Sequence, residues 1–380
     1  MGFWIWFALL VIAAFSPQGH TTQKISLDKW GLRDIQLPRL KTDDKKEILI
    51  AVIDTGIDET HPDLAQNLWQ NPGETGFDQR GRNKAGNGID DDQNGFVDDV
   101  YGWDFVRQNP KPRDQHGHGT HIAGLIHQIA PQAKLMILKY YDPKLRAVDT
   151  IKYTASAFEY AAKMGAQIIN YSGGGSSQSR EEFQALEVAK KLNVLVVAAA
   201  GNEGQNSDIK PYYPANYDLS HILSVTAHNP KRQLLETSNF GANNVDLSAP
   251  GEHIWSTMPG GGYGLMTGTS QATALATGVA ALTLSQNFFL KTPEEVIQHL
   301  ILTGALEPAQ QGKTRQARRL DAQRALYVFD SWPQGLFGTA EDNRPTTLNR
   351  GPSSPPTLKE LTEQLAQKLS RPTVNMKPLP

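Results

Sequence analysis

Apolar runs and segments with helical periodicity alternate between about residues 24 and 330. A short apolar run bounded by turn residues is typical of a strand that is buried on both faces, as in parallel sheets covered by helices. The alternation therefore predicts an α/β fold with a parallel central sheet and helices on both faces. The expected strands are residues 48–53, 135–138, 168–171, 194–199, 223–227 and 245–248, and the expected helices are residues 118–129, 149–164, 180–192, 270–287 and 292–302.

The first residues follow a different pattern. Residues 3–15 form one apolar run, which is too short to cross about 30 Å of hydrocarbon comfortably but suits the core of a signal peptide. We therefore expect residues 1–20 to be a signal peptide or a short N-terminal anchor, and the protein to be exported to an extracellular or periplasmic space. Contact with a membrane is expected only if this segment stays uncleaved.

The last residues, 331–380, are expected to lie outside the folded domain of residues 24–330. Residues 344–356 hold four prolines together with serine, threonine and glycine, a composition typical of an extended linker. A capping box of Thr357 and Glu360 then predicts a short amphipathic helix, which is either an unspecialised tail element or a partner-docking element. Its apolar face carries Leu358, Leu361, Leu365 and Leu369.

Composition narrows the class of function. The 380 residues include 37 Lys and Arg against 39 Asp and Glu, which gives a net charge of −2. Because there is no basic excess, nucleic acid is not an expected partner. The sequence contains no cysteine, which excludes disulfide bonds, thiolate zinc sites and a cysteine nucleophile. The expected oligomeric state is a monomer.

Three segments carry residue types that could act together in catalysis. Asp54 ends a predicted strand, where open α/β sheets place their sites, although an aspartate there is as often a turn or capping residue. His118 opens a predicted helix among small residues, and Ser270 lies at the start of an Ala-rich helix, which favours developing negative charge. A nucleophilic hydroxyl needs a base, and the base needs an orienting carboxylate. The three residues therefore form a hypothesis only together.

A fourth segment, residues 198–204, leads from a predicted strand into an asparagine flanked by glycine. The sequence Asn-Glu-Gly is an ordinary turn. Alternatively, the Asn202 side-chain amide could complete an oxyanion hole with the backbone N–H of Ser270, a kind of contact worth about 3 kcal/mol of transition-state stabilisation.

These motifs resemble those of the subtilisin-like serine peptidases, the subtilases. The resemblance covers about residues 29 to 328. It implies that Asp54 orients the imidazole, that His118 acts as general base and then as acid, that Ser270 is the nucleophile, and that Asn202 is the oxyanion donor. The aspartate, histidine and serine motifs match at residues 51–58, 118–124 and 268–270, and supporting stretches match in order at residues 170–174, 199–202, 213–215, 238–241 and 248–251.

The sequence departs from the family pattern after the nucleophile. Residues 271–275 read Gln-Ala-Thr-Ala-Leu where the family usually has Met-Ala-x-Pro-His. These positions lie on the helix behind the serine, so the change affects packing more than proton transfer.

The same resemblance implies how a polypeptide substrate binds. Tyr212 is expected near the base of the S1 pocket, which receives the side chain before the scissile bond, and its bulk makes that pocket shallower. Glu203 is expected at the exposed rim, where it adds less than about 1 kcal/mol toward a basic side chain. We expect cleavage after medium-sized apolar residues, with minor acceptance of Lys or Arg. The substrate-binding residues are then Ser172, Gly173, Gly174, Ala199, Ala200, Gly201, Glu203 and Tyr212.

An acidic stretch lies between the aspartate and histidine motifs, within an expected insertion at about residues 65–110. If Asp90 is position 1, the loop follows EF-hand order to position 9, but position 12 is Tyr101 instead of Glu. A similar insertion in some bacterial subtilases is associated with calcium. We expect a structural Ca²⁺ ion, with a solvated acidic loop as the alternative. The expected ligands are Asp90, Asp92, Asn94, the Phe96 carbonyl, Asp98 and Asp99.

Two other classes of function can be weighed against the same residues. A catalytically silent subtilase fold could serve as a calcium-stabilised binding protein. An α/β-hydrolase is excluded because in that class the catalytic residues occur along the chain in the order Ser, acid, His, whereas the order here is Asp, His, Ser.

Residues 29–35 resemble the opening of the family's mature catalytic domain and follow closely on the expected signal. This leaves no room for the family's usual propeptide, so we expect folding without one.

Overall fold

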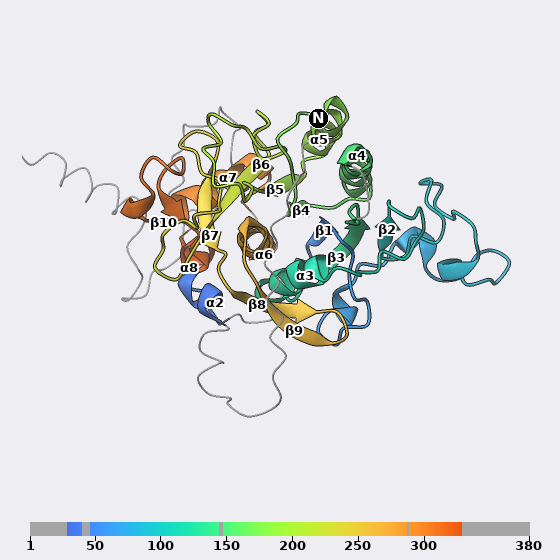
Figure 1. Ribbon diagram of the computed structural model, residues 1–380. Coiled ribbons are helices and arrows are strands. Elements are labelled where there is room, and N and C mark those ends of the chain that lie inside the picture. The colour runs from blue at the N-terminus through green and yellow to red at the C-terminus, as the bar shows by residue number, and fades with distance from the viewer. Residues whose placement is uncertain (1–28, 40–45, 144–146, 287–288, 329–380) are drawn as a thin grey trace, which may run out of the picture. The chain divides into compact units, whose positions relative to one another are not determined.

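The computed structural model describes residues 29–39, 46–143, 147–286 and 289–328 (Figure 1). The expected signal segment and the expected C-terminal helix lie outside these residues. Internal contacts divide the chain into two units, residues 1–325 and residues 326–380, and the description of the second unit is confined to its first three residues. The fold described below is that of the first unit.

A nine-stranded sheet forms the centre of this unit. Its strand order is β10-β11-β7-β6-β5-β4-β1-β3-β2, and every neighbouring pair is parallel except β10 and β11. The predicted α/β class is therefore confirmed. The strands are β1 (Leu49–Asp54), β2 (Gly102–Asp104), β3 (Lys134–Lys139), β4 (Ile168–Tyr171), β5 (Leu195–Ala199), β6 (Ile222–His228), β7 (Leu247–Pro250), β10 (Ala305–Leu306) and β11 (Arg318–Arg319).

Helices cover both faces of the sheet. Figure 1 shows α4 and α5 together on one side and α3 with α6 on the other. Alternate residues of the central strands, such as Ala51 and Ile53 of β1, join the core under α4 and α5, where Phe158 and Leu186 are fully buried. The helices are α2 (Trp30–Asp34), α3 (His118–Ile129), α4 (Ala147–Lys163), α5 (Arg180–Lys191), α6 (Thr269–Gln286), α7 (Pro293–Thr303) and α8 (Ala322–Tyr327).

The long helices and strands agree with those predicted from the sequence, whereas short or glycine-rich elements were not predicted. Helix α3 has the predicted bounds, and α7 lies at the predicted helix of residues 292–302, with Thr292 as its N-cap in a complete capping box with Glu295. A separate two-stranded hairpin of β8 (Ile254–Met258) and β9 (Gly262–Met266) was not predicted. Two features hid it: four glycines interrupt the apolar pattern at residues 260–264, and the hairpin pairs only with itself.

Helix α6 is buried on every side. All but two of its residues are buried, including the threonines, because it lies against the sheet on one side and against α3 on the other. The close approach to α3 requires a glycine, since a Cβ on Gly278 would lie 2.8 Å from the Cβ of Ile129. The Ala-rich composition thus permits a central helix that places Ser270 in its first turn.

The hairpin fixes the other side of α3. The Ser256 hydroxyl donates to the His121 carbonyl and the Thr257 hydroxyl donates to the Thr120 carbonyl, both at 2.7 Å. A Cβ on Gly124 would overlap both hydroxyl oxygens. Helix α3 is therefore held between α6 and the hairpin.

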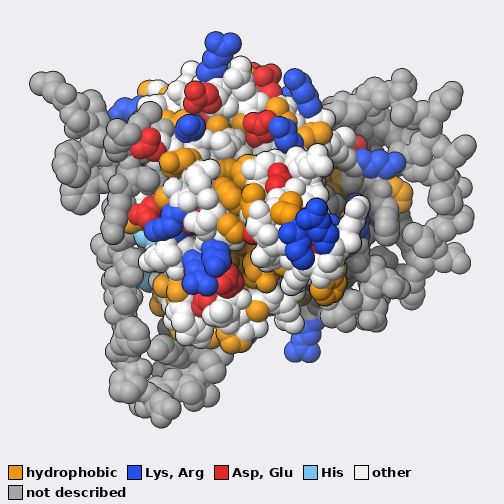
Figure 2. Space-filling view, turned by 90° about the vertical axis from the view of Figure 1, so that its right-hand side faces the viewer, with side chains coloured by type: hydrophobic (Ala, Val, Ile, Leu, Met, Phe, Trp, Pro, Cys, Tyr) orange, Lys and Arg blue, Asp and Glu red, His pale blue; other side chains and the backbone are white. Residues whose placement is uncertain are grey.

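The described surface carries charges of both signs. On the face shown in Figure 2, basic and acidic side chains are interspersed with each other and with apolar ones. Within the described residues, the helices are either too short or too polar for a bilayer span.

We expect Gly124→Ala to lower the free energy of unfolding by about 1–3 kcal/mol, because the added methyl group has no room beside the hairpin hydroxyls. Urea-induced unfolding measures this change. Gly86→Ala is the matched control, since a Cβ on Gly86 meets no atom within 4 Å. Equal loss in the two variants would contradict the packing described here.

Candidate active site

The candidate site lies at the carboxyl ends of the central strands, where open parallel sheets place their sites. Asp54 is the last residue of β1, Ser172 follows β4, and Asn202 follows β5 closely. His118 is the first residue of α3, and Ser270 is the second residue of α6. Five elements therefore bring the predicted residues to one edge of the sheet.

Asp54 and His118 form a buried hydrogen-bonded pair. The Asp54 Oδ1 atom lies 2.7 Å from His118 Nδ1, and the same oxygen accepts the backbone N–H of Thr55 at 2.7 Å. Burial opposes protonation of His118, but the charge of Asp54 and its hydrogen bond outweigh burial and raise the pKa of the imidazole above its ordinary value. Nδ1 is thus held by the carboxylate, and Nε2 is left to exchange a proton.

Asp114 positions the start of α3 and was not found from the sequence. The N-cap residue, Gly117, has no side chain, and the Asp114 carboxylate takes over the capping role. It accepts the backbone N–H groups of His116, Gly117 and Thr120, as well as the hydroxyls of Thr55 and Thr120. Because Thr55 follows Asp54 directly, this carboxylate ties β1 to α3. An aspartate shortly before a glycine at a helix start is the signal that could have revealed it.

Ser270 is buried in the first turn of α6. Its hydroxyl donates to the Ser172 carbonyl at 3.1 Å, and the Ser172 hydroxyl donates back to the Ser270 carbonyl at 3.2 Å. In this arrangement, the Ser270 hydroxyl donates its hydrogen bond to a backbone oxygen and not to His118. Transfer of its proton to the imidazole therefore requires the hydroxyl hydrogen to turn away from this carbonyl oxygen.

The orientation of Asn202 is fixed from α6. Its side-chain Oδ1 accepts the backbone N–H of Thr269 at 2.9 Å and the Thr269 hydroxyl at 3.1 Å. Because Oδ1 accepts hydrogen bonds from α6, the Nδ2 amide of this exposed residue remains as a donor. This donor and the backbone N–H of Ser270 belong to adjoining segments at the helix N-terminus.

Tyr212 fills the space between the two segments expected to line S1. A Cβ on Gly174 would overlap the Tyr212 ring, and a Cβ on Gly201 would lie 2.9 Å from its Cγ. Tyr212 itself is buried, whereas Glu203 is exposed and accepts the side-chain N–H of Asn239 at 2.7 Å. The ring therefore leaves little depth between the residue 172–174 segment and the residue 199–201 segment.

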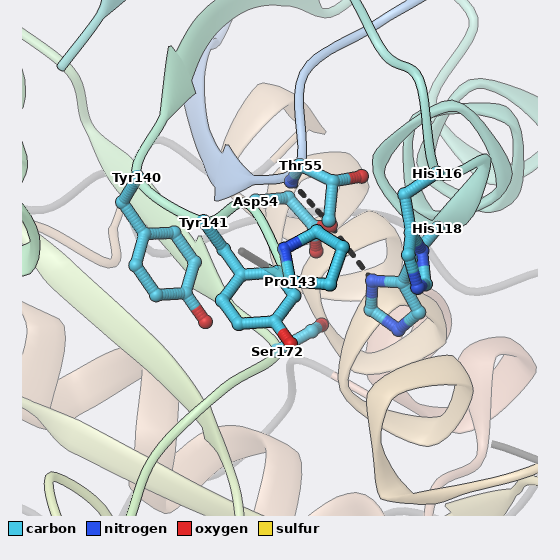
Figure 3. Close-up of a pocket in the computed structure, with 8 residues that line it drawn as sticks. All are labelled: Asp54, Thr55, His116, His118, Tyr140, Tyr141, Pro143 and Ser172. Carbon is cyan, nitrogen blue, oxygen red and sulfur yellow. Dashed lines mark hydrogen bonds and ion pairs between the residues drawn. The ribbon is translucent and has the colours of Figure 1, made fainter. Parts of the chain in front are cut away.

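A pocket with a cavity volume of about 170 Å³ opens beside this pair of Asp54 and His118 (Figure 3). Two tyrosine rings, two histidine rings and a proline contribute to it, and its walls are largely apolar. His116, which follows the capping aspartate closely, lies on the same side as His118. The lining residues are Asp54, Thr55, His116, His118, Tyr140, Tyr141, Pro143 and Ser172.

A second cluster of carboxylates lies in the segment between β1 and α3. Oxygens of Glu74, Asp92 and Asp99 lie within 4.8 Å of one another. Glu74 and Asp99 are buried, and burial together with neighbouring acids raises the pKa of both carboxyl groups. Glu74 Oε2 is buried without a hydrogen-bond partner. Sequence spacing did not reveal Glu74, because it lies far along the chain from the acidic loop.

The other expected ligands are arranged around the same loop. Asp90 Oδ1 and Asp92 Oδ1 both accept the backbone N–H of Asn94 at 3.1 Å. The Asp98 carboxylate accepts the backbone N–H of Gly88 at 3.2 Å. The ring of Phe96 packs edge-on against Tyr160, whose hydroxyl donates to Asp99.

Comparison with known proteins assigns the chain to a family. The sequence profile of the subtilase family matches residues 45–333, which is more than half of the chain. The chain therefore belongs to the subtilase family, and the resemblance inferred from its motifs is confirmed. Its relatives are named as serine proteases, so the protein is a hydrolase of that class.

Two relatives illustrate the similarity. The chain is 33% identical over 288 residues to the major intracellular serine protease of Bacillus subtilis (strain 168), covering 71% of this chain and 81% of the relative. It is 32% identical over 247 residues to thermitase of Thermoactinomyces vulgaris, covering 62% and 75% respectively.

Solved structures support the same fold. A cold-adapted subtilisin-like serine proteinase matches with a TM-score of 0.60 and 26% identity, covering 77% of this chain and 97% of that protein. A lanthipeptide protease matches with a TM-score of 0.60 and 25% identity, covering 80% and 95% respectively.

We expect two neighbouring histidines of α3 to titrate on opposite sides of the ordinary pKa of about 6.5. Asp54 raises the pKa of His118, whereas burial lowers the pKa of His121 to about 3. NMR of the ring protons over a pH series measures both. Asp54→Asn should lower the pKa of His118, and the pKa of His121 should stay below its ordinary value. A His118 that stays deprotonated below the ordinary pKa in the unchanged protein would contradict this.

Proposed function

We propose that the chain hydrolyses peptide bonds of polypeptide substrates through an acyl-enzyme formed on Ser270. The observation that carries this proposal is the buried 2.7 Å pair of Asp54 and His118, which lines the same pocket as Ser172, the hydrogen-bond partner of Ser270. The family supplies the class of reaction, and the geometry supplies the candidate roles.

In the first half of the reaction, Ser270 Oγ attacks the substrate carbonyl carbon while His118 Nε2 takes the hydroxyl proton. Asp54 holds the imidazole through Nδ1–H and stabilises the imidazolium that forms. His118 then gives the proton to the leaving amine, and the acyl group stays on Ser270. In the second half, His118 takes a proton from water while the water oxygen attacks the acyl carbon. The acyl–Oγ bond then breaks, His118 returns the proton to Ser270 Oγ, and the acid leaves.

Asn202 is the proposed donor to the oxyanion. Its Nδ2 amide and the backbone N–H of Ser270 bind the carbonyl oxygen as negative charge develops, and α6 contributes the positive end of its dipole. The bonds from Thr269 to Asn202 Oδ1 support this role because they prevent the amide from turning its oxygen toward the substrate.

The proposed substrate site follows the sequence expectation. The substrate backbone pairs with Ser172, Gly173 and Gly174, and Ala199, Ala200 and Gly201 form the facing wall of S1. The buried Tyr212 ring makes this pocket shallow, which favours medium-sized apolar side chains. The exposed Glu203 carboxylate adds a minor preference for Lys or Arg that weakens with salt.

A Ca²⁺ ion is the proposed structural cofactor. Hard cations take oxygen ligands, and the cluster supplies three close carboxylates with an unpartnered buried oxygen on Glu74. Such a cluster is unfavourable without a counter-ion. Glu74 thus joins the ligands proposed from the sequence, which are Asp90, Asp92, Asn94, the Phe96 carbonyl, Asp98 and Asp99.

Export is also proposed, on the basis of the apolar run at residues 3–15. Family membership alone does not decide the compartment, because two relatives are named intracellular serine proteases. N-terminal sequencing of the protein recovered from separate cellular fractions tests both export and cleavage.

We expect Ser270→Ala to abolish peptide cleavage and labelling by a fluorophosphonate while preserving the fold, because alanine suits a helix and lacks the nucleophile. Asn202→Ala should lower kcat by roughly 10²- to 10³-fold with little change in KM. Ser285→Ala, at the far end of α6, is the matched control and should keep full activity. An unlabelled but folded protein would instead favour a binding function.

We expect EDTA to lower the Tm of the protein, because an ion that binds only the folded state stabilises it by about 2.7 kcal/mol at a hundredfold excess over Kd. Glu74→Gln and the double variant Asp90→Ala/Asp92→Ala should respond to EDTA much less. Asp78→Asn is the control, since that carboxylate lies in the same segment but pairs with Arg82. Equal EDTA shifts in all four proteins would place any calcium elsewhere.

A further inference from the structure

The pocket beside Asp54 has two walls that come from separate segments. One wall is the loop at the start of α3, with His116, and the other is the segment after β3, with Tyr141 and Pro143. The rings of His116 and Tyr141 lie edge to face, with centroids 6.3 Å apart and planes at 81° (Figure 3). The spacing of these two segments determines which side chain fits between them.

The guanidinium of Arg107 reaches both walls. Its Nη1 atom donates to Gln115 Oε1 at 3.3 Å, and its Nη2 atom donates to Asp142 Oδ2 at 3.1 Å. Gln115 immediately precedes His116, and Asp142 stands between Tyr141 and Pro143. The Arg107 guanidinium therefore connects Gln115 and Asp142, which are adjacent in sequence to the residues that carry the two rings.

The arginine is itself anchored to the end of β2. Asp104 is buried, and its carboxylate accepts the Arg107 backbone N–H at 2.9 Å and lies 3.4 Å from Nη1. On the α3 side, the buried Lys139 donates to both the Arg113 carbonyl and the Gln115 side chain. The loop that carries His116 is thus fixed from β2 and from β3.

We propose that Arg107 is a positioning residue that sets the width of this pocket and thereby the size of the substrate side chain it accepts. The inference rests on the proposed peptidase function. Because the walls are tyrosine, histidine and proline rings, the side chain that enters is apolar. Arg107 is about half exposed, so its ion pairs contribute little to stability and its effect lies in the geometry.

Arginine suits this role better than lysine. Its two terminal nitrogens point along fixed directions from one plane and can hold two acceptors at once, whereas an ammonium group rotates freely. Lysine should therefore keep one of the two connections, and methionine should keep neither.

The test uses fluorogenic peptides in which each of four positions before the scissile bond is varied in turn through Gly, Ala, Leu and Phe. In the unchanged protein, we expect a preference for Leu or Phe over Gly at the position that occupies the pocket. Arg107→Met should reduce this preference roughly fivefold or more, through KM, and leave the other positions within about twofold. Arg107→Lys should be intermediate.

Arg82→Met is the matched control, because it removes an exposed ion pair with Asp78 in the same segment without touching the pocket walls. If the unchanged protein cleaves peptides and is labelled by the fluorophosphonate, two results would overturn the positioning role of Arg107. These are unchanged side-chain preferences in Arg107→Met, or an equal loss of preference at all four positions. Absence of cleavage and labelling in the unchanged protein would instead overturn the proposed function, and this inference with it.

Discussion

The buried hydrogen bond between Asp54 and His118 is the constraint on which the rest of the site depends. It joins the end of an interior strand to the first residue of a helix, so β1 and α3 must meet within one side-chain length. Burial makes an unpaired carboxylate or imidazolium costly, and the pair therefore requires its supports. Asp114 supplies the cap, and Gly119 leaves room where a Cβ would overlap the Gly56 carbonyl.

The sequence predicted the parts of the fold whose stabilising pattern is local. Long strands and helices can be recognised from the spacing of their apolar residues, and a helix start can be recognised from a capping residue such as Thr292. The order of the aspartate, histidine and serine motifs predicted which side chains would meet at the sheet edge. Asp114, Glu74 and Arg107 escaped because each acts through partners in other segments. No local pattern distinguishes Glu74 or Arg107 from an ordinary surface charge, whereas Asp114 had a local signal in its position shortly before the glycine at the start of α3.

The segment between β1 and α3 is more closely connected to the domain than its acidic composition suggests. Phe96 packs against Trp103, Phe105 and Tyr160, and Tyr160 in turn donates to Asp99 from α4. At its other end, Arg107 links β2 to the loops around the pocket. An aromatic anchor and a charged anchor thus join one irregular segment to the core and to the site.

The position of the β8–β9 hairpin has a consequence for the protein during its synthesis. The hairpin holds α3 but follows it by more than a hundred residues, and Ser270 comes later still. A nascent chain that has exposed Asp54 and His118 therefore lacks both the clamp on α3 and the candidate nucleophile. Because domains generally fold as units, the order of the segments postpones assembly of the candidate site until the hairpin and the first turn of α6 have been synthesised.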